Sequence, residues 1–538
     1  MKLNYSYYNC KKYENQYSDY DLENEKIVKA RYVHAVLDSD VGNPYIEALP
    51  FPRCDEDIND AYTQTLPTYD YTEVKNMDKF EKMLQISSLR QLRFPLSFHK
   101  TLEFSFYNSL LTSYRSRKVH NVVKGTVEYV INDGQQETSA LLYGDSGAST
   151  NAGFSLIGYS GCGKSSALQT LLSQYPQTII HENGEFNRYV LIVYLVVNCI
   201  PNSNFSALYE SIGEAFDKAL GNSTPVYQKE IAKSLNLGKK LEKVKELVER
   251  FGVGVIIFDE IQLINFEQSK DNSFEALMTL ANRTKVAIAV VGTEDARDKM
   301  FKELRTARRI GTMINGDTYC DNKKFFTYLM SQMFQYQWFD EPVKLTNGIV
   351  EAFYKVTHGI IDQMIGIFIC MQIDYLEKKV RPVVNADYVY EIANKYYPGI
   401  QNVLANLETV EAARKLSSIR NDADVVVSTI LDKAKQEKDA EEIMQSKDTS
   451  VDNRLLLKNV IKNITMIYDE YSVFDIEKAF KSVMKNNKNA TKTEREISKA
   501  VIEKLNKPTK TFTKKQKDNN IPTMDSIKMR SFVDTKGE

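Results

Sequence analysis

Hydrophobic residues in the middle of the chain form short uninterrupted runs, and the segments between them carry apolar residues at helical spacing. The runs are rich in β-branched residues and lie at 154–157, 191–197, 255–258 and 286–291. Uninterrupted runs of this length are typical of parallel strands that are buried on both faces. Segments 205–220 and 237–251 repeat apolar residues every three or four positions, which predicts amphipathic helices. The pattern predicts an α/β domain with a parallel sheet and helices on both of its faces.

The pattern changes on both sides of this α/β segment. Residues up to about 90 are rich in Tyr, Asp and Asn and show few periodic stretches, so we expect an extension that wraps on the larger domain, or a partly ordered tail. Residues 98–114 present one apolar helical face just before the first strand, which predicts a helix there. After about 321 the apolar residues keep only helical spacing, which predicts an all-helical lid.

These changes divide the chain of 538 residues, whose length suggests two or more domains. The predicted segments are an N-terminal extension, an α/β core, a helical lid, a charged linker with short helices and a flexible basic tail, at 1–95, 96–320, 321–420, 421–480 and 481–538. Lys and Arg far outnumber Asp and Glu in the first part of that tail. Such a tail attracts DNA or an acidic partner, and a solvated tail without a partner is the alternative.

Composition and charge limit the class of protein. With a net charge of −1 and 43% hydrophobic residues, the chain is neither a globally basic nucleic-acid binder nor wholly disordered. The N-terminus lacks an apolar secretion signal, and the longest apolar runs are too short to span a bilayer. We therefore expect a cytoplasmic protein without a membrane partner. The six cysteines show no C-x-x-C spacing, so neither a zinc site nor a disulfide framework is expected.

A phosphate-binding loop directly follows the first predicted strand. Residues 158–165 match G-x-x-x-x-G-K-[ST] at every fixed position, and a helical segment follows them. In such a loop backbone N–H groups wrap the phosphates, while Lys164 reaches the β- and γ-phosphates and Ser165 holds Mg²⁺. The predicted cofactors are thus ATP and Mg²⁺, and the predicted binding residues are Gly158, Ser160, Gly161, Cys162, Gly163, Lys164, Ser165 and Ser166. The alternative is a flexible glycine-containing surface loop.

Two carboxylates end the strand at 255–258 and form a Walker B motif. We expect Asp259 to join Ser165 in the Mg²⁺ shell and Glu260 to polarise the attacking water. The alternative is a strand that ends in an acidic turn. Thr293 follows the next strand, where it could sense the γ-phosphate.

Three arginines lie further along, after the predicted sensor. Arg305, Arg308 and Arg309 are candidate arginine fingers for the ATP of a neighbouring subunit, with a surface charge cluster as the alternative. Phosphate loop, Walker B, polar sensor, arginine cluster and helical lid follow one another in the order of an AAA+ ATPase. No guanine-specifying N-K-x-D motif is visible. Because AAA+ sites lie between subunits, ATP binding should be coupled to assembly of a ring or helical filament.

Several local stretches resemble the TnsC/TniB family of AAA+ transposition regulators, and the length is closer to TnsC. They are Gly42–Pro50, Asp259–Gln262, Val291–Ala296 with Ala307–Arg309, Gln335–Trp338 and His358–Asp362. The resemblance covers residues from about 42 to 372. It implies an ATP-dependent oligomer in the prokaryotic cytoplasm that sits on target double-stranded DNA, independently of its sequence, and connects a target-selection protein to the transposase. Residues 359–363 lack a lid arginine of the sensor-two type.

The resemblance also implies partners and a cycle for DNA recombination. Hydrolysis by Glu260 would dismantle the assembly, and the basic C-terminal tail would dock transposase subunits through scattered apolar anchors. DNA would contact lysines of the segment between the second strand and Walker B, namely Lys218, Lys229, Lys233, Lys239 and Lys240. An ordinary solvated helix face is the alternative. Two other functions remain open, an initiator or helicase-loading ATPase in DNA replication and a nucleotide-gated signalling scaffold that does not touch DNA.

Overall fold

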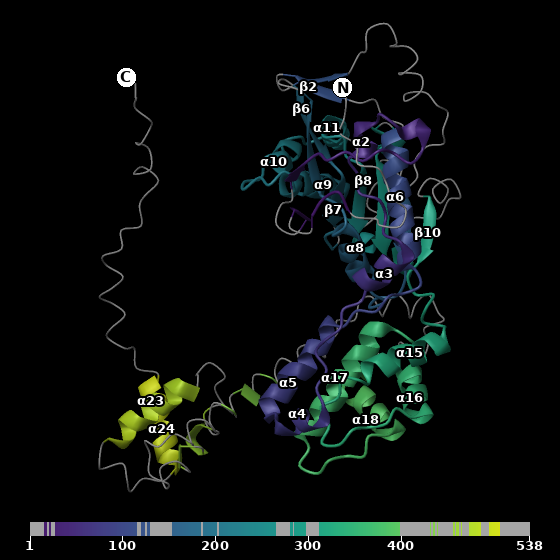
Figure 1. Ribbon diagram of the computed structural model, residues 1–538. Coiled ribbons are helices and arrows are strands. Elements are labelled where there is room, and N and C mark those ends of the chain that lie inside the picture. Colours follow the sequence, from purple (N-terminus) through teal and green to yellow (C-terminus); the bar gives the residue numbers. More distant parts are fainter. Residues whose placement is uncertain are drawn as a thin grey trace, which may run out of the picture. The chain divides into compact units, whose positions relative to one another are not determined.

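The computed structural model of the protein (Figure 1) divides into two compact units, Met1–Val427 and Ser428–Glu538. In the first unit the structure describes residues 15–18, 21–22, 27–115, 120–123, 126–129, 153–183, 187–201, 204–264, 280–282, 284–296 and 311–398. In the second it describes residues 473–485, 494–505 and a few shorter stretches between 431 and 464.

Five parallel strands form the central sheet of the first unit. They are β4 (Phe154–Ile157), β7 (Tyr194–Asn198), β8 (Val255–Asp259), β9 (Ala287–Gly292) and β10 (Thr312–Asn315). Their order in the sheet is β10-β4-β9-β8-β7. Strand β9 thus lies between β4 and β8, and because carboxyl ends of parallel strands share one edge, the residues after these three strands meet there.

Helices cover both faces of this sheet, as predicted. The long helix α6 (His99–Arg115) packs on the face that contains Phe154, whose ring lies 6.5 Å from that of Phe106. The next residues along β4 alternate in direction, and Ile157 faces the opposite core, which holds α9 (Phe205–Ala219) and α11 (Leu237–Arg250). This arrangement confirms the predicted α/β fold with a helical lid and extra terminal segments.

The predicted strand at 191–197 is in fact two strands that belong to different sheets. Strand β6 (Asn187–Ile192) pairs antiparallel with β5 (Thr178–Asn183), which pairs parallel with β1 (Ile27–Lys29). At Val193 the chain changes sheet, since its N–H donates to Gln177 O at 2.9 Å while its carbonyl accepts from Val255 in β8. The apolar run was uninterrupted because both sheets bury it, so periodicity gave no sign of the break. The hairpin of β2 (His120–Val123) and β3 (Thr126–Tyr129) forms a third, two-stranded sheet.

The N-terminal segment is more helical than we predicted. It contains α2 (Pro44–Glu47), α3 (Asp55–Ala61), α4 (Tyr71–Asn76), α5 (Lys79–Ser88) and the 3-10 turn η2 (Leu89–Gln91). Asp70 with Glu73, and Asp78 with Glu81, form two capping boxes that start α4 and α5. This D-x-x-E spacing was visible in the sequence and would have predicted both helices.

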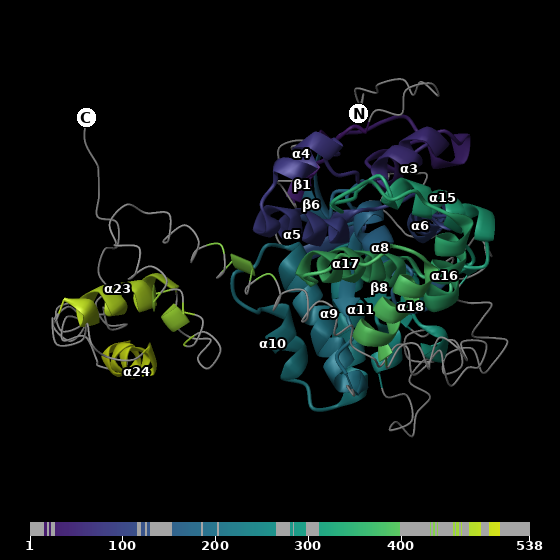
Figure 2. The same ribbon diagram turned by 90° about the horizontal axis from the view of Figure 1, so that it is seen from below.

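Four helices form the lid. They are α15 (Lys323–Met333), α16 (Asn347–Thr357), α17 (Ile361–Glu377) and α18 (Ala386–Tyr396). Helix α17 is buried along almost its whole length, and α5 of the N-terminal segment lies beside it (Figures 1 and 2). The N-terminal segment therefore packs on the lid as well as on the core.

Helical structure in the second unit continues past residue 481, where we placed the start of a flexible tail, and residues 506–538 of that tail lie outside the described residues. Helices α23 (Val473–Met484) and α24 (Glu494–Leu505) pack together through a small apolar core. Phe480 of α23 and Val501 of α24 are both at most 1% exposed. Helix α23 lies where a short helix was expected near the end of 421–480, whereas α24 was missed because its exposed lysines, such as Lys499 and Lys504, obscured the amphipathic spacing. Nowhere in the described ranges is a helix both long and apolar enough to cross a membrane.

Candidate functional site

The loop at residues 158–163 has the backbone of a phosphate-binding loop. Gly161 and Gly163 have φ of 82° and 93°, in the left-handed region where a side chain costs energy. A Cβ on Gly161 would also approach Cβ of Asp362 to 2.9 Å. Gly163 is the N-cap of helix α8 (Lys164–Leu172). The loop thus leads into a helix N-terminus, whose free N–H groups and positive end favour phosphate.

Lys164 lies at the start of α8 with only 6% of its surface exposed. Its ammonium donates to the carbonyl oxygens of Gly158 at 2.9 Å and Tyr159 at 2.8 Å. The charged group is therefore held inside the curve of the loop by neutral acceptors. No carboxylate among the described residues forms an ion pair with this ammonium, so it is well placed to attract the charge of a phosphate.

The Walker B carboxylates follow β8 and differ in position. Asp259 is next to the phosphate loop, where the nearby Ser165 hydroxyl favours the charged form of its carboxylate. Burial raises the pKa of Asp259 most, and the negative charge of Glu260 raises it further. The Lys164 ammonium and the Ser165 hydroxyl oppose that shift. Glu260 is exposed and has left-handed backbone, with φ of 56°. Such a conformation is unfavourable for a residue with a Cβ and often marks a functional turn.

Thr293 follows β9, between the phosphate loop and the Walker B turn. It is 4% exposed, and its Oγ1 has no hydrogen-bond partner among the described residues. The side chain lines the same cavity as Lys164 and Glu260. A buried hydroxyl without a partner costs free energy, so this group is suited to bind a ligand in the cavity.

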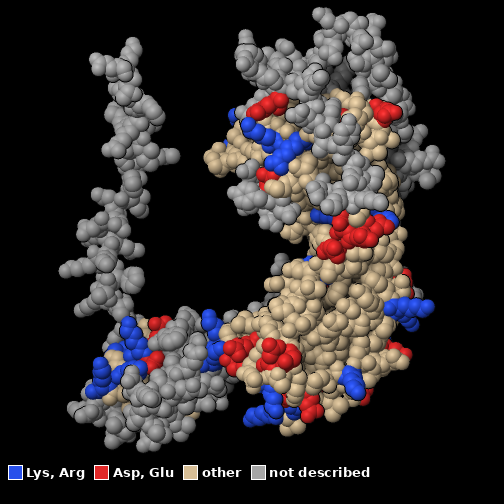
Figure 3. Space-filling view, viewed as in Figure 1, with Lys and Arg blue, Asp and Glu red and all other residues tan. Residues whose placement is uncertain are grey.

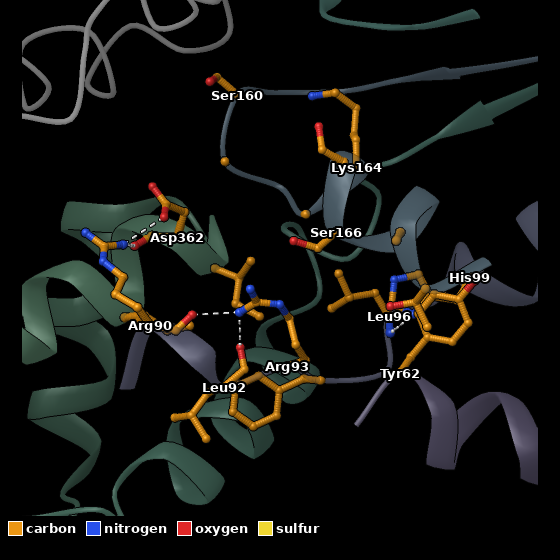
Figure 4. Close-up of a pocket in the computed structure, with 18 of the residues that line it drawn as sticks. Tyr62, Arg90, Leu92, Arg93, Leu96, His99, Ser160, Lys164, Ser166 and Asp362 are labelled. Atoms are coloured by element: carbon orange, nitrogen blue, oxygen red, sulfur yellow. Dashed lines mark hydrogen bonds and ion pairs between the residues drawn. The ribbon is translucent and has the colours of Figure 1, made fainter. Parts of the chain in front are cut away.

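The cavity has a volume of about 280 Å³ and separates the phosphate loop from residues 90–99 and the lid (Figure 4). Its far wall is formed by apolar side chains, namely Leu92, Phe94, Leu96, Ile361 and Ile365. Figure 4 shows Ser166 on the loop side of the cavity with Arg93 below it, whereas the Lys164 side chain turns back toward Ser160 along the loop. The loop side of the cavity is therefore polar and suited to phosphate. The opposite side combines these apolar side chains with the charged groups of Arg90, Arg93 and Asp362.

Two stacked rings complete the apolar side. Tyr62 and His99 lie with ring centroids 4.0 Å apart at an angle of 25°. The Leu96 N–H donates to Nδ1 of His99 at 3.0 Å, so the ring hydrogen of the neutral form is on Nε2. Burial lowers the pKa of His99 to about 3. The ring is thus neutral at physiological pH, and both stacked rings are buried in the cavity wall, with His99 4% and Tyr62 3% exposed.

An ion pair joins the N-terminal segment to the lid at the edge of this cavity. Arg90 Nη1 lies 2.8 Å from Oδ1 of Asp362 (Figure 4). Asp362 is in the first turn of α17, and its N–H donates to Gly161 O at 3.3 Å. The lid helix therefore rests directly on the phosphate loop, and Arg90 supplies a guanidinium where the lid itself has none.

The donor set at this site fits a magnesium nucleotide. Two glycines shape the loop, Lys164 and Thr293 line the same cavity, and Ser165 and Asp259 offer oxygen ligands. Within the described residues no group of three or more His, Cys, Asp and Glu could hold a metal ion. Mg²⁺ would therefore be held by Ser165 and Asp259 together with phosphate oxygens and water, as this ion prefers.

Most predicted site residues come together at this cavity. Those that line it are Ser160, Gly161, Gly163, Lys164, Ser165, Ser166, Glu260 and Thr293. Gly158 and Cys162 form the base of the loop, where burial raises the pKa of the Cys162 thiol. Arg305, Arg308 and Arg309 lie outside the described residues, so their role as arginine fingers stays a prediction.

The predicted DNA-contacting lysines do not form one free basic surface. Lys240 is buried and pairs with Glu210, because its ammonium turns inward between α9 and α11. It cannot reach DNA, which corrects that prediction. Lys218 pairs with Glu214 at 2.7 Å, and over α10 (Tyr227–Ala232) and α11 acidic and basic side chains lie next to one another (Figure 3). The lysines that are exposed and form no ion pair with described residues are Lys229, Lys233 and Lys239.

Sequence reasoning missed the far wall of the cavity. Tyr62, Arg90, Arg93 and His99 reach the site from the N-terminal segment and the start of α6. Their spacing matches no nucleotide-binding motif, and they face phosphate-loop residues about 60 or more positions away in the sequence. Of the cavity residues outside the phosphate loop and the Walker B turn, Asp362 did carry a sequence signal, because it belongs to a stretch that resembles a family lid motif.

Comparison with known proteins agrees with this geometry. The family described as AAA domain matches residues 149–300, and no curated protein matches the chain. Similar solved structures include Orc1 of Aeropyrum pernix in complex with DNA, with 15% identity, TM-score 0.32 and coverage of 68% of this chain and 79% of that one. Cdc6p of Pyrobaculum aerophilum has 14% identity, TM-score 0.27 and coverage of 48% and 66%.

NtrX of Brucella abortus in complex with ATP is also similar, with 12% identity, TM-score 0.24 and coverage of 52% of this chain and 63% of that one. Scores this low carry no argument about function. The family match at residues 149–300 includes the phosphate loop whose geometry is described above. The chain therefore contains, over residues 149–300, an AAA domain of the P-loop NTPase type.

Proposed function

We propose that the protein binds ATP with Mg²⁺ in the cavity between the phosphate loop and the lid, and that it hydrolyses the ATP. One observation carries this proposal, which is that Lys164, Glu260 and Thr293 line a single cavity. They follow three adjacent strands, β4, β8 and β9. An ammonium, a carboxylate and a hydroxyl are the groups that phosphoryl transfer to water requires.

The nucleotide would lie with its phosphates in the loop and its base on the apolar side. Backbone N–H groups of residues 161–165 would bind the phosphates at the helix N-terminus. Tyr62 and His99 would contact the base from the cavity wall, and the neutral state of His99 avoids a buried charge there. Leu92 and Ile365 would exclude water from the base.

Bound Mg²⁺ would neutralise charge on the phosphate oxygens. Ser165 and Asp259 would hold the ion, and Lys164 would exchange its loop carbonyls for phosphate oxygens. Glu260 would accept a hydrogen bond from the attacking water and orient it toward the γ-phosphorus. The Thr293 hydroxyl would donate to a γ-phosphate oxygen, which would satisfy its unpaired buried Oγ1. Catalysis in this scheme is positioning and charge stabilisation.

We further propose that ATP binding drives self-assembly on double-stranded DNA. The support is the AAA domain together with the motif resemblance, because AAA+ nucleotide sites are completed by a neighbouring subunit. Arg305, Arg308 or Arg309 would supply that contact. Lys229, Lys233 and Lys239 would meet the phosphate backbone independently of DNA sequence.

Two DNA-related roles suit such an ATPase. The AAA domain accommodates a replication initiator or helicase loader, whose partner would be a helicase. A transposition regulator is the second candidate, favoured by the family-like stretches 259–262 and 358–362, which both contribute to the proposed nucleotide site. None of the solved structures named above is a transposition protein, so the transposase and the target selector rest on that resemblance alone.

The test begins with nucleotide binding and phosphate release by the purified protein. Wild-type protein should bind ATP, and Lys164→Ala should weaken binding at least about 100-fold, because it removes a buried ammonium from the phosphates. Glu260→Gln should keep ATP bound and lower hydrolysis about 100-fold or more. Full binding by Lys164→Ala would refute the site.

Random-sequence duplex DNA then tests assembly. Wild-type protein with ATP should form particles on DNA that electron microscopy can see, whereas Lys164→Ala should not. Absence of DNA binding with ATP, ADP and a non-hydrolysable analogue would exclude both DNA-related roles and favour a signalling scaffold. If DNA is bound, a helicase and a transposase from the same source distinguish the two roles by direct binding.

A further inference from the structure

Gln262 lies two residues after the proposed catalytic glutamate, in the 3-10 turn η3 (Ile261–Leu263). Its side chain folds back, so that Nε2 donates to the Glu260 carboxylate. At the other end of the amide, Oε1 accepts from the Thr293 N–H at 3.2 Å. One amide thus bridges the Walker B turn and the residue after β9.

The orientation of this amide is fixed by chemistry. A backbone N–H only donates, so the end of the amide that faces Thr293 must be the carbonyl oxygen. The NH₂ group therefore faces Glu260, where an ionised carboxylate only accepts. Gly292 keeps the space open, since a Cβ there would approach Oε1 of Gln262 to 2.8 Å.

The bridge continues to the phosphate loop through one peptide unit. The N–H of Thr293 and the carbonyl of Gly292 belong to the same planar peptide group. That carbonyl accepts from the N–H of Gly158, the first loop residue, at 3.3 Å. A chain of hydrogen bonds therefore runs from Gly158 through the 292–293 peptide and Gln262 to the Glu260 carboxylate.

We propose that Gln262 is the positioning residue that sets the Glu260 carboxylate for hydrolysis and ties its position to the phosphate loop. This inference rests on the proposed function. Glu260 is exposed and its backbone is left-handed, so little else among the described contacts restrains its side chain. Because the bridge reaches the phosphate loop, the conformation of that loop and the position of the Glu260 carboxylate are coupled. When the loop binds phosphates, the carboxylate is held in the position for hydrolysis.

Two substitutions separate positioning from mere support of the fold. Gln262→Glu has the same size and keeps an oxygen for the Thr293 N–H, but it replaces the donor that faces Glu260. Gln262→Met has a similar length and loses both hydrogen bonds. If Gln262 only satisfied the Thr293 N–H, Gln262→Glu would behave like the wild type.

The measurements are kcat and KM for ATP hydrolysis by the full chain, with the dissociation constant for a non-hydrolysable ATP analogue. Both variants should lower kcat about 10- to 100-fold, the usual loss for a misplaced catalytic group. The dissociation constant should change less than about 3-fold, since Gln262 does not line the nucleotide cavity. In a Glu260→Gln background, Gln262→Glu should have no further effect on kcat, because residues that act as a unit are not additive.

Gln332→Ala is the matched control, a half-buried glutamine of α15 that is absent from the cavity lining, and its kcat should equal that of the wild type. A wild-type kcat in Gln262→Glu would overturn the inference and leave the proposed function intact. Equal losses from Gln262→Glu in both backgrounds would also overturn it. A wild-type protein that hydrolyses no ATP would overturn the proposed function and this inference with it.

Discussion

At the scale of single residues, His181 shows how burial fixes a protonation state. Its side chain is fully buried, stacks on Tyr189 with centroids 4.4 Å apart, and shares a hydrogen bond of 2.8 Å between Nδ1 and the Tyr32 hydroxyl. Burial lowers the pKa of His181 to about 3 from an ordinary value of 6.5. The folded protein therefore keeps this ring neutral over a range in which the unfolded chain protonates it.

This difference predicts a loss of stability in mild acid. Because the folded pKa lies below the unfolded one, protons favour the unfolded chain once the pH falls below about 6.5, and the loss continues down to about 3. When the pH falls from 7.5 to 5, the contribution of His181 should lower the free energy of unfolding by about 2 kcal/mol. Urea unfolding at both pH values should show that His181→Gln loses about 2 kcal/mol less than the wild type. Equal losses would contradict the expectation.

Residues of the phosphate loop could be predicted from the sequence because their chemistry is local. Gly161, Gly163 and Lys164 must be neighbours to surround a phosphate, so a motif of eight positions identifies them. Tyr62 and Arg90 could not be predicted, since the fold alone brings them to the cavity. Lys240 misled the prediction for a related reason, because sequence does not show that Glu210 faces it across two helices.

At the scale of elements, the lid and the N-terminal segment act on the nucleotide site together. Arg90 follows α5, Asp362 starts α17, and their ion pair adjoins the loop at Gly161. The sequence predicted a lid without a sensor-two arginine, and the structure supplies a guanidinium from a segment about 270 residues away. Helix periodicity predicted the lid helices, whereas the pairing of α5 with α17 depends on tertiary contacts that no local pattern encodes.

We expect the Arg90–Asp362 pair to contribute to nucleotide binding through closure of the lid. Arg90→Ala should weaken ATP binding about 3- to 10-fold, and Asp362→Ala should weaken it by a similar factor. In the double variant the losses should overlap, with a coupling of up to about 1 kcal/mol because both groups are partly exposed to solvent. Isothermal titration calorimetry provides the dissociation constants.

The control for that cycle is Arg381→Ala. Arg381 forms a comparable ion pair with Asp340 at 2.7 Å, also on the lid, but it does not line the cavity. Its removal should leave ATP affinity unchanged. Strictly additive losses in the Arg90 and Asp362 cycle would show that the two residues act independently of one another.

At the scale of the whole molecule, the two compact units have separate cores. The second unit has its own apolar core, in which Ile476 and Ile497 are at most 1% exposed. Every residue that lines the nucleotide cavity belongs to the first unit. Units of this kind usually fold and bind their ligands independently.

A chain that ends at Val427 should therefore bind ATP with nearly the affinity of the full chain, within about 2-fold. Its thermal unfolding should keep the transition that ATP shifts upward, since ligand binding stabilises only the unit that holds the site. Differential scanning calorimetry with and without ATP tests both points. A loss of affinity above about 10-fold would mean that residues beyond 427 contribute to nucleotide binding.

The order of strands in the central sheet has a consequence for biosynthesis. Strand β4, which leads into the phosphate loop, lies between β9 and β10, the last two strands of the sheet to leave the ribosome. Bacterial and eukaryotic ribosomes add about 5–20 residues per second, so β4 waits on the order of ten seconds for its first neighbour. During that time its backbone edges and apolar side chains are open to wrong partners, and ATP cannot stabilise the nascent domain. Chaperone dependence should therefore be greatest while residues 158–287 are being synthesised.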